Sequence, residues 1–363
     1  MKVGILTWYK ELNHGAVLQA YASQEFLKQN GYSPVIVDYE RKTSNNLGVL
    51  ESTRKRLKRL FSGDYKYNGD YEKYKTIKKQ CFSNFSESAF DHISSISDQY
   101  DCIMIGSDMV FSLIQGFSPY MFGIGIDSKY IFSYAACSGG TKYKLVARLG
   151  LIQQIENGLS RFNSLGCRDE ETQLFVKQFL PSANPVLNID PVLLYGFDKE
   201  KHNWNSRENK SSKYLLVYSY HGDMNSKQEI SEIRKYAKSH NLRIVSVGYF
   251  HPWCDENING DPKIFFDLFL NADVIITDTF HGTVFSIILN KRFCSIIRGN
   301  AFKLHHLLVS SGLDSRIANN PCEIAPILEL PIDYSTCSEW LTEQRTRSKK
   351  YILENLEIAS KNY

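Results

Sequence analysis

A histidine stands in the turn of this sequence that is best placed to do chemistry. Residues 273–290 read DVIITDTFHGTVFSIILN, in which a polar turn with Thr279, His281 and Gly282 separates two apolar runs. This order is typical of a strand that leads into the N-terminus of a helix. Helix N-termini favour anions, and ligands of open α/β sheets bind at the carboxyl ends of strands. The turn therefore predicts a site for an anionic substrate beside an imidazole.

Three further turns carry polar side chains close behind apolar runs. Their candidate residues are Asn13, His14, Gly15, Ser107, Asp108 and Arg168. A hydroxyl and a carboxylate can hold sugar hydroxyls, and a guanidinium binds carboxylate or phosphate through two points. Capping of the next helix or turn explains the Asn, Ser and Asp equally well, and an ion pair with Asp169 or Glu170 would explain Arg168. Spacing alone leaves both interpretations open.

The apolar periodicity predicts an α/β fold of two Rossmann-like domains that face each other across a cleft. Strands at 2–7 and 34–38 flank a helix at 15–30, and a second alternating series begins at 214. Such β-α-β units need a parallel sheet with right-handed crossovers. We expect an N-terminal domain over 1–200, a C-terminal domain over 213–334, and a helix over 335–363 that packs back across both.

Composition narrows the class of protein. The 363 residues are 43% hydrophobic and carry a net charge of +4, which is too weak to indicate nucleic-acid binding without a localised basic stripe. Nothing near Met1 resembles a signal peptide, and no apolar run approaches the roughly 20 residues that span a bilayer, so we expect a cytoplasmic protein. The eight cysteines lack metal-ligand spacing, so we expect no metal site.

A basic insertion at 53–80 interrupts the alternation of strands and helices. It contains RKRLKR at 54–59 and EKYKTIKKQ at 72–80, and it has little apparent capacity to form a core. One interpretation is a solvated helical face, since charge runs are usually exposed. The other is a peripheral contact with an anionic membrane, where each basic residue contributes about 1 kcal/mol.

Five ordered blocks of the sequence resemble the polysaccharide pyruvyl transferase family. They read TWYKELNHGAVLQAYA, YDCIMIGSD with YIFSYAACSGG, LGCRDEET, NADVIITDTFHGTVFSIILNKRF and NAFKLHHLLVSSGLDSR. The resemblance implies a GT-B-like pair of domains, and transfer of a pyruvyl group from phosphoenolpyruvate to a sugar, usually as a cyclic ketal. It thus implies an enzyme of exopolysaccharide or capsule biosynthesis that acts on a sugar or lipid-linked oligosaccharide, without a cofactor.

The same resemblance implies roles for individual residues. His281 and Arg168 are expected to be catalytic, with His281 as the acid that protonates the methylene carbon of phosphoenolpyruvate. The expected donor-binding residues, in the C-terminal domain, are Thr279, Gly282, Thr283, Arg298, Asn300, Lys303 and Arg316. The expected acceptor-binding residues, in the N-terminal domain, are Asn13, His14, Gly15, Ser107 and Asp108.

The chain also departs from the family pattern. Some members have an Arg two residues before the turn histidine, where this chain has Thr279, and Met109 and Phe111 stand where Gln and Trp are usual. These departures leave open a changed donor or acceptor. Two other functions therefore compete: a GT-B glycosyltransferase that uses a nucleotide sugar, and a non-catalytic glycan-binding protein.

Overall fold

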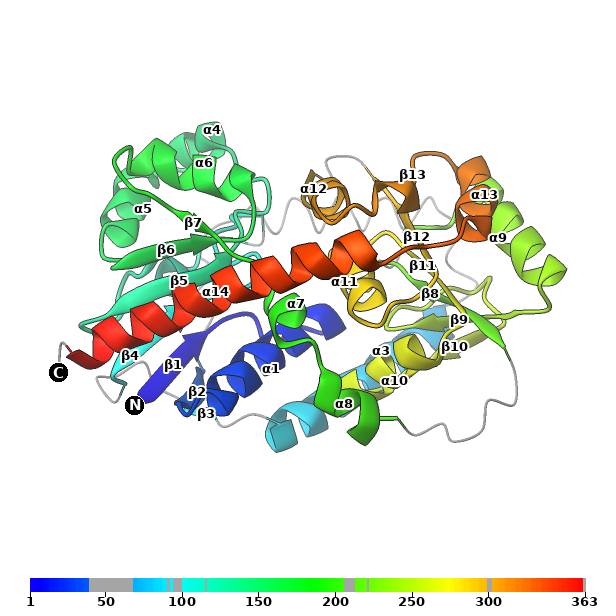
Figure 1. Cartoon of the computed structure of the whole chain (residues 1–363), viewed down its shortest axis with the longest axis horizontal. Helices are drawn as coiled ribbons and strands as arrows, with labels where there is room; N and C mark the ends of the chain where they lie inside the picture. The colour runs from blue at the N-terminus through cyan, green and yellow to red at the C-terminus, as the bar shows by residue number, and fades with distance from the viewer. Residues whose placement is uncertain are drawn as a thin grey trace.

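The protein contains two parallel sheets, each covered by helices (Figure 1). The computed structural model describes residues 1–38, 68–89, 92–93, 100–114, 116–205, 213–220, 222–298 and 302–361. Within these residues, the strands of each sheet alternate with helices along the chain, as in a Rossmann-like domain. The predicted α/β fold class is confirmed.

The N-terminal sheet has seven strands in the order β3-β2-β1-β4-β5-β6-β7. Its strands are β1 (Lys2–Leu6), β2 (Ser33–Val37), β3 (His92–Ile93), β4 (Cys102–Ile105), β5 (Ile131–Ala136), β6 (Ser164–Cys167) and β7 (Val186–Leu187). Its helices are α1 (His14–Gln29), α3 (Asn68–Ala89), α4 (Tyr143–Arg148), α5 (Ile152–Leu159) and α6 (Glu170–Phe179), with a 3-10 turn at Pro119–Phe122. The short helices α7 (Pro191–Tyr195) and α8 (Asp198–Asn203) lead toward the second sheet.

The C-terminal sheet has six strands in the order β10-β9-β8-β11-β12-β13. They are β8 (Tyr214–Tyr218), β9 (Arg243–Val247), β10 (Glu256–Ile258), β11 (Val274–Thr277), β12 (Phe293–Ile296) and β13 (Ile317–Ala318). Its helices are α9 (Lys227–Ser239), α10 (Pro262–Asn271), α11 (Phe280–Ile288), α12 (Phe302–Ser310) and α13 (Ile324–Glu329), with 3-10 turns at Asp314–Arg316 and Pro321–Glu323. Strands β8, β11 and β12 are buried at every position, because helices cover both faces of the sheet.

A shared apolar core joins the two sheets. It contains side chains from α1, α7, α10 and α11, and the ring of Phe197 stacks on Phe266 with centroids 5.4 Å apart. Phe285 of α11 meets Phe197 edge-on at 5.6 Å. Aromatic pairs of this kind stabilise a contact beyond their buried area. The starts of α1 and α11 also lie close together, since a Cβ atom at Gly15 would be 2.3 Å from the His281 ring.

Helix α3 contains part of the predicted basic insertion and packs against loops of the C-terminal sheet. Tyr74, Lys78, Phe82 and Phe85 form a buried stripe on one face of this helix. The Tyr74 hydroxyl donates to the Ile258 carbonyl at 3.1 Å, and the Lys78 ammonium donates to the Gly248 carbonyl at 2.5 Å. The expectation of little core-forming capacity is wrong for this part. Residues 53–67 lie outside the described residues, so the membrane interpretation is untested there.

The last helix, α14 (Ser335–Lys361), runs from the C-terminal sheet back over the N-terminal sheet (Figure 1). Just before it, the Tyr334 hydroxyl donates to the Lys291 carbonyl at 2.7 Å. Near its end, the Tyr351 hydroxyl donates to the Ser133 carbonyl of β5 at 2.9 Å. None of the described helices combines the length and the apolar character needed to cross a bilayer.

Candidate active site

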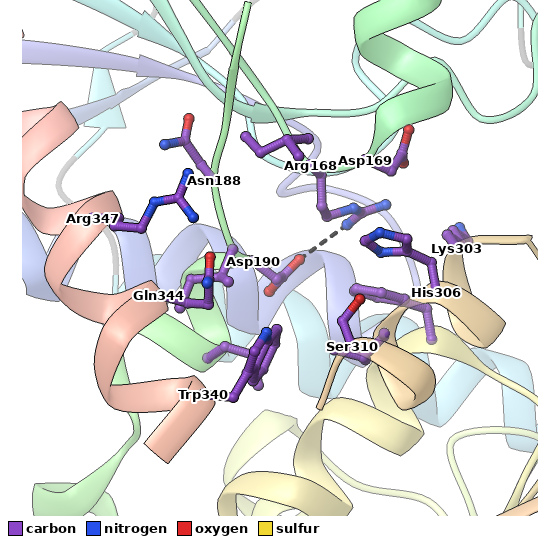
Figure 2. Close-up of a pocket in the computed structure, with 15 residues that line it drawn as sticks. Arg168, Asp169, Asn188, Asp190, Lys303, His306, Ser310, Trp340, Gln344 and Arg347 are labelled. Carbon is purple, nitrogen blue, oxygen red and sulfur yellow. Dashed lines mark hydrogen bonds and ion pairs between the residues drawn. The ribbon is translucent and has the colours of Figure 1, made fainter. Parts of the chain in front are cut away.

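Arg168 and His281 meet at one buried carboxylate, Asp190. Arg168 directly follows β6, Asp190 stands just before α7, and His281 lies in the first turn of α11. Nη1 of Arg168 donates to Oδ2 of Asp190 at 3.0 Å, the contact drawn in Figure 2. Nε2 of His281 lies 3.5 Å from the same oxygen. The structure thus brings the two predicted catalytic side chains together, while their roles stay predictions.

The Asp190 carboxylate is fixed in place from both sides. Its Oδ1 accepts the Val192 amide at 3.0 Å and so caps α7, whose first residue is Pro191. Burial raises the pKa of Asp190, but the neighbouring His281 and Arg168 outweigh it and hold the pKa at about 2. Asp190 is therefore an ionised carboxylate at neutral pH.

The Arg168 guanidinium is buried and only partly used. Nη2 lies 3.6 Å from Oδ1 of Asp108, and the guanidinium carbon lies 4.4 Å from the centre of the Phe280 ring. Burial lowers the pKa of Arg168, but Cys137 and Asp108 raise it, and the net pKa stands above its ordinary value. Its Nε and Nη2 make no hydrogen bond within the described part of the chain. Since buried donors are normally satisfied, these two atoms indicate a partner beyond the described residues.

The cap of α11 and a glycine on α1 position the imidazole. Thr279 is the N-cap, and its Oγ1 accepts the Gly282 amide at 2.9 Å. A Cβ atom at Gly15 would lie 2.3 Å from the His281 ring, so only glycine fits there. Gly15 therefore allows the close approach of His281. The sequence predicts instead that Gly15 faces the acceptor. Nε2 of His281 makes no hydrogen bond to any described residue.

The amides of Gly282 and Thr283 are already used by the helix. The Gly282 amide donates to the Thr279 side chain, and the Thr283 amide donates to the Thr279 carbonyl at 3.2 Å. Oγ1 of Thr283 also lies 2.6 Å from the Ser295 hydroxyl. If Gly282 and Thr283 bind the donor as expected, they do not do so through these amides, because the side chain and the carbonyl of Thr279 already accept them.

A pocket of about 220 Å³ opens beside Arg168 and Asp190 (Figure 2). Its polar lining residues are Arg168, Asp169, Asn188, Asp190, Lys303, His306, Ser310, Gln344 and Arg347. They come from both sheets and from α14. His281 is not among them, but its Nε2 lies 3.5 Å from Oδ2 of Asp190, which does line the pocket. The pocket is smaller than the roughly 300–1,000 Å³ that drug-sized ligands occupy, so it suits a small metabolite.

Lys303 is the expected donor residue that lines this pocket. Its ammonium lies 5.6 Å from the centre of the Phe280 ring, the ring that also faces Arg168. It also lies 3.7 Å from the Met109 sulfur. Arg168 and Lys303 thus present two cations from different sheets to one small space.

Arg298 and Arg316, two further expected donor-binding residues, do not line this pocket. Arg298 donates through Nε to Asp278 at 2.6 Å and also pairs with Glu229. Arg316 is buried, and its Nη1 donates to the Ile327 and Leu330 carbonyls. Both guanidiniums are occupied by protein groups that distant parts of the sequence supply. Asn300 lies outside the described residues.

Of the expected acceptor residues, only Asp108 contacts Arg168 directly. Asn13 caps α1 by accepting the Gly15 amide at 3.0 Å, and the Ser107 hydroxyl donates to the Ala135 carbonyl at 2.8 Å. His14 is fully buried, with Nε2 3.0 Å from the Gly260 carbonyl, and burial lowers its pKa well below the ordinary value. These side chains shape the protein around the site.

Sequence reasoning missed Asp190 and the contribution of α14. The segment NIDPVLLY does contain a signal, because Asp followed by Pro is typical of a helix start. That signal indicates a cap and gives no hint that the second carboxylate oxygen receives Arg168. No motif in the last helix pointed to the pocket.

Residues 13–300 match the sequence model of the polysaccharide pyruvyl transferase family. A comparison with curated proteins gives no match. Among solved structures, the chain is similar to the UDP-GlcNAc 2-epimerase of Neisseria meningitidis bound to UDP-GlcNAc, with 11% identity, a TM-score of 0.52, and coverage of 98% of this chain and 99% of that chain. It is also similar to a putative UDP-N-acetylglucosamine 2-epimerase from Listeria monocytogenes, with 8% identity, a TM-score of 0.54, and coverage of 98% and 97%.

A third similar structure is the UDP-N-acetylglucosamine 2-epimerase of Rickettsia bellii, with 12% identity, a TM-score of 0.53, and coverage of 99% of this chain and 96% of that chain. At these identities the solved structures show the fold alone, and they confirm the GT-B-like arrangement. The family model, in contrast, covers most of the sequence, including Arg168, Asp190 and His281. The chain therefore belongs to the polysaccharide pyruvyl transferase family.

Proposed function

We propose that the protein transfers a pyruvyl group from phosphoenolpyruvate to a pair of sugar hydroxyls, forming a cyclic ketal in bacterial surface polysaccharide biosynthesis. Membership of the family supports a pyruvyl transferase. The observation that carries the donor assignment is the buried Arg168, whose Nε and Nη2 are free of hydrogen bonds within the described residues and which lines a small pocket with Lys303.

The pocket suits the charge and size of phosphoenolpyruvate. This donor carries a phosphate and a carboxylate close together, and the Arg168 guanidinium, whose Nε and Nη2 make no hydrogen bond to a described residue, can bind one of them in two-point fashion. The Lys303 ammonium supplies a second positive charge. A volume of about 220 Å³ supports a three-carbon donor over a nucleotide sugar, which is a much larger ligand.

The proposed chemistry begins with proton transfer to the methylene carbon of the donor. In this proposal His281 gives this proton through Nε2, which makes no hydrogen bond to a described residue and lies 3.5 Å from Asp190 at the pocket wall, and Asp190 orients the ring. A sugar hydroxyl bonds to the oxocarbenium-like carbon and loses its proton. The carbon–oxygen bond to phosphate then breaks, and a second hydroxyl closes the ketal and releases its proton.

We assign the acceptor to the side of the site where Asp108 stands. Its carboxylate is 15% exposed and lies 3.6 Å from Arg168, so it can accept a hydrogen bond from a sugar hydroxyl near the donor. In this proposal the N-terminal domain binds the acceptor and the C-terminal domain contributes Lys303 and His281 to the donor. The reaction would take place in the cytoplasm, on a sugar or a lipid-linked oligosaccharide at the inner membrane face.

The test is incubation of the protein with phosphoenolpyruvate and candidate glycans, followed by mass spectrometry and a phosphate assay. We expect a glycan product heavier by one ketal-linked pyruvate, with release of one phosphate. Parallel incubation with nucleotide sugars provides the contrast. Release of a nucleoside diphosphate without pyruvylation would contradict the proposal and favour a glycosyltransferase, and the absence of both reactions across a glycan panel would favour a binding protein.

A further inference from the structure

The C-terminal helix forms one wall of the pocket. Trp340, Gln344 and Arg347 line it, and their spacing of four and three residues places them on one face of α14. Figure 2 shows the three side chains extending from α14 toward the segment that carries Asn188 and Asp190. The notable member of this stripe is Arg347, since it adds a third cation to a pocket that already contains Arg168 and Lys303.

Two hydrogen bonds hold α14 against the segment that carries Asp190. The Ile189 amide donates to the Ser348 hydroxyl at 3.0 Å, and Nε of Arg345 donates to the Leu193 carbonyl at 2.7 Å. These two contacts flank Arg347 in sequence and tie α14 to the same short segment that carries Asp190. The position of the Arg347 backbone relative to Asp190 is therefore fixed by hydrogen bonds on both sides.

Arg347 is weakly engaged by the protein itself. Its Nη1 lies 4.0 Å from Glu343 one turn earlier, and both side chains are more than half exposed, at 57% and 67%. An exposed pair at this distance contributes little. Asn188, which lines the same pocket, is 3% exposed, and neither polar atom of its side chain makes a hydrogen bond to a described residue. A buried polar group without a partner and a loosely paired guanidinium together indicate a missing polar ligand.

We propose that Arg347 is an anion-binding residue of this pocket and holds the phosphate or carboxylate of the donor that faces α14. Arg168 binds from the N-terminal sheet, Lys303 from the C-terminal sheet, and Arg347 from the helix that spans both. Identification of the anion as phosphoenolpyruvate rests on the proposed function, whereas the presence of an anion site rests on the three cations and the unpartnered Asn188.

The experiment compares R347Q and R347K with K350Q, a matched control on the same helix. Lys350 is exposed, pairs with Glu354 at 3.7 Å and does not line the pocket. The dissociation constant for phosphoenolpyruvate is measured by calorimetry, together with kcat and KM. We expect R347Q to weaken binding about tenfold and raise the donor KM by the same factor, with the acceptor KM unchanged. R347K should fall between wild type and R347Q, because lysine keeps the charge and loses the two-point geometry.

The result that overturns the inference is an R347Q variant that binds phosphoenolpyruvate as tightly as K350Q does. A wild-type protein that binds no phosphoenolpyruvate would instead contradict the proposed function. In that case inorganic phosphate, pyrophosphate and UDP are titrated into the same three variants. Selective loss of any of these anions in R347Q supports the anion site, and equal binding in R347Q and K350Q overturns it.

Discussion

At the scale of single residues, the site centres on the Asp190 carboxylate, which lies next to both Arg168 and His281. Oδ2 of Asp190 receives Arg168 at 3.0 Å and lies 3.5 Å from His281, while Oδ1 caps α7. A carboxylate next to an imidazole fixes its orientation and stabilises its protonated form. The carboxylate thereby connects the proposed acid to the proposed anion-binding guanidinium.

Asp190→Asn tests this connection, because it removes the charge and keeps the shape. We expect kcat to fall about 100-fold, since the imidazole loses the anion that orients it. Asp198→Asn, at an exposed ion pair with Lys201, is the control. A D190N variant with a wild-type kcat would contradict the proposed role.

The same variant makes a prediction about stability. Because the pKa of Asp190 is held at about 2, its stabilising contribution is present above the unfolded value near pH 4 and is lost as the pH falls toward 2. We expect D190N to lower the free energy of unfolding at pH 7 by on the order of 2 kcal/mol. Urea unfolding at pH 7 and pH 3 checks this, and the gap between variant and wild type should narrow at the lower pH.

His281→Gln tests the proposed acid. Loss of general acid catalysis should lower kcat by about 10²–10⁴-fold and leave the affinity for phosphoenolpyruvate within severalfold, because the proposed binding of its anionic groups is by Arg168 and Lys303. His240, a partly exposed histidine that pairs with Glu329, provides the control H240Q. The measurements are steady-state kinetics and calorimetry, and a kcat above one tenth of wild type would exclude the assignment.

At the scale of elements, the helices α1 and α11 begin against each other. The His281 ring occupies the space that a Cβ atom at Gly15 would take, and the Thr279 cap holds the first turn of α11 in place. The sequence predicted both helix starts from their polar turns. It could not predict that the two turns pack face to face, because this contact joins residues that are far apart along the chain.

Gly15→Ala therefore should displace the imidazole. The new methyl group would lie 2.3 Å from the ring, so we expect a loss of kcat comparable to that of H281Q, together with a lower melting temperature. Circular dichroism establishes whether the variant is folded before its activity is measured. A folded G15A variant with full activity would show that the close contact is unimportant for His281.

In helix α3 the spacing of apolar residues did not predict the buried face. Its buried stripe contains Lys78 between Tyr74 and Phe82, so a charged residue stands where the helical period needs an apolar one. The buried charge is stabilised because the Lys78 ammonium donates a hydrogen bond to the Gly248 carbonyl and lies 4.3 Å from the centre of the Tyr249 ring. The strands were easier to predict, since fully buried strands are continuous apolar runs.

At the scale of the whole molecule, the two sheets are joined by α3, by α14 and by the shared aromatic core. The sequence predicted two Rossmann-like domains, and the family resemblance led to Arg168 and His281. Neither predicted that a segment of the N-terminal half would pack on the loops after β9 and β10. Contacts of this kind depend on how the domains dock, which local patterns do not encode.

The buried Lys78 predicts that the free energy of unfolding depends on pH. Burial lowers the pKa of Lys78 from its ordinary value near 10.5 to about 7. Because the unfolded chain keeps this proton up to about pH 10.5, the group makes folding more favourable as pH rises from 7 to 10.5. We expect Lys78→Met to flatten this dependence in urea unfolding, with the exposed Lys79→Met as control. Parallel profiles of K78M and wild type between pH 7 and 9.5 would contradict the assignment.

The indole of Trp340 stands in the pocket wall, and the remaining tryptophans, Trp8, Trp204 and Trp253, do not line it. Indole emission responds to nearby charge and polarity. Binding of a phosphorylated ligand should therefore change the intrinsic fluorescence of Trp340, one of the four tryptophans. The chain thus contains its own optical reporter, by which occupancy can be followed without turnover.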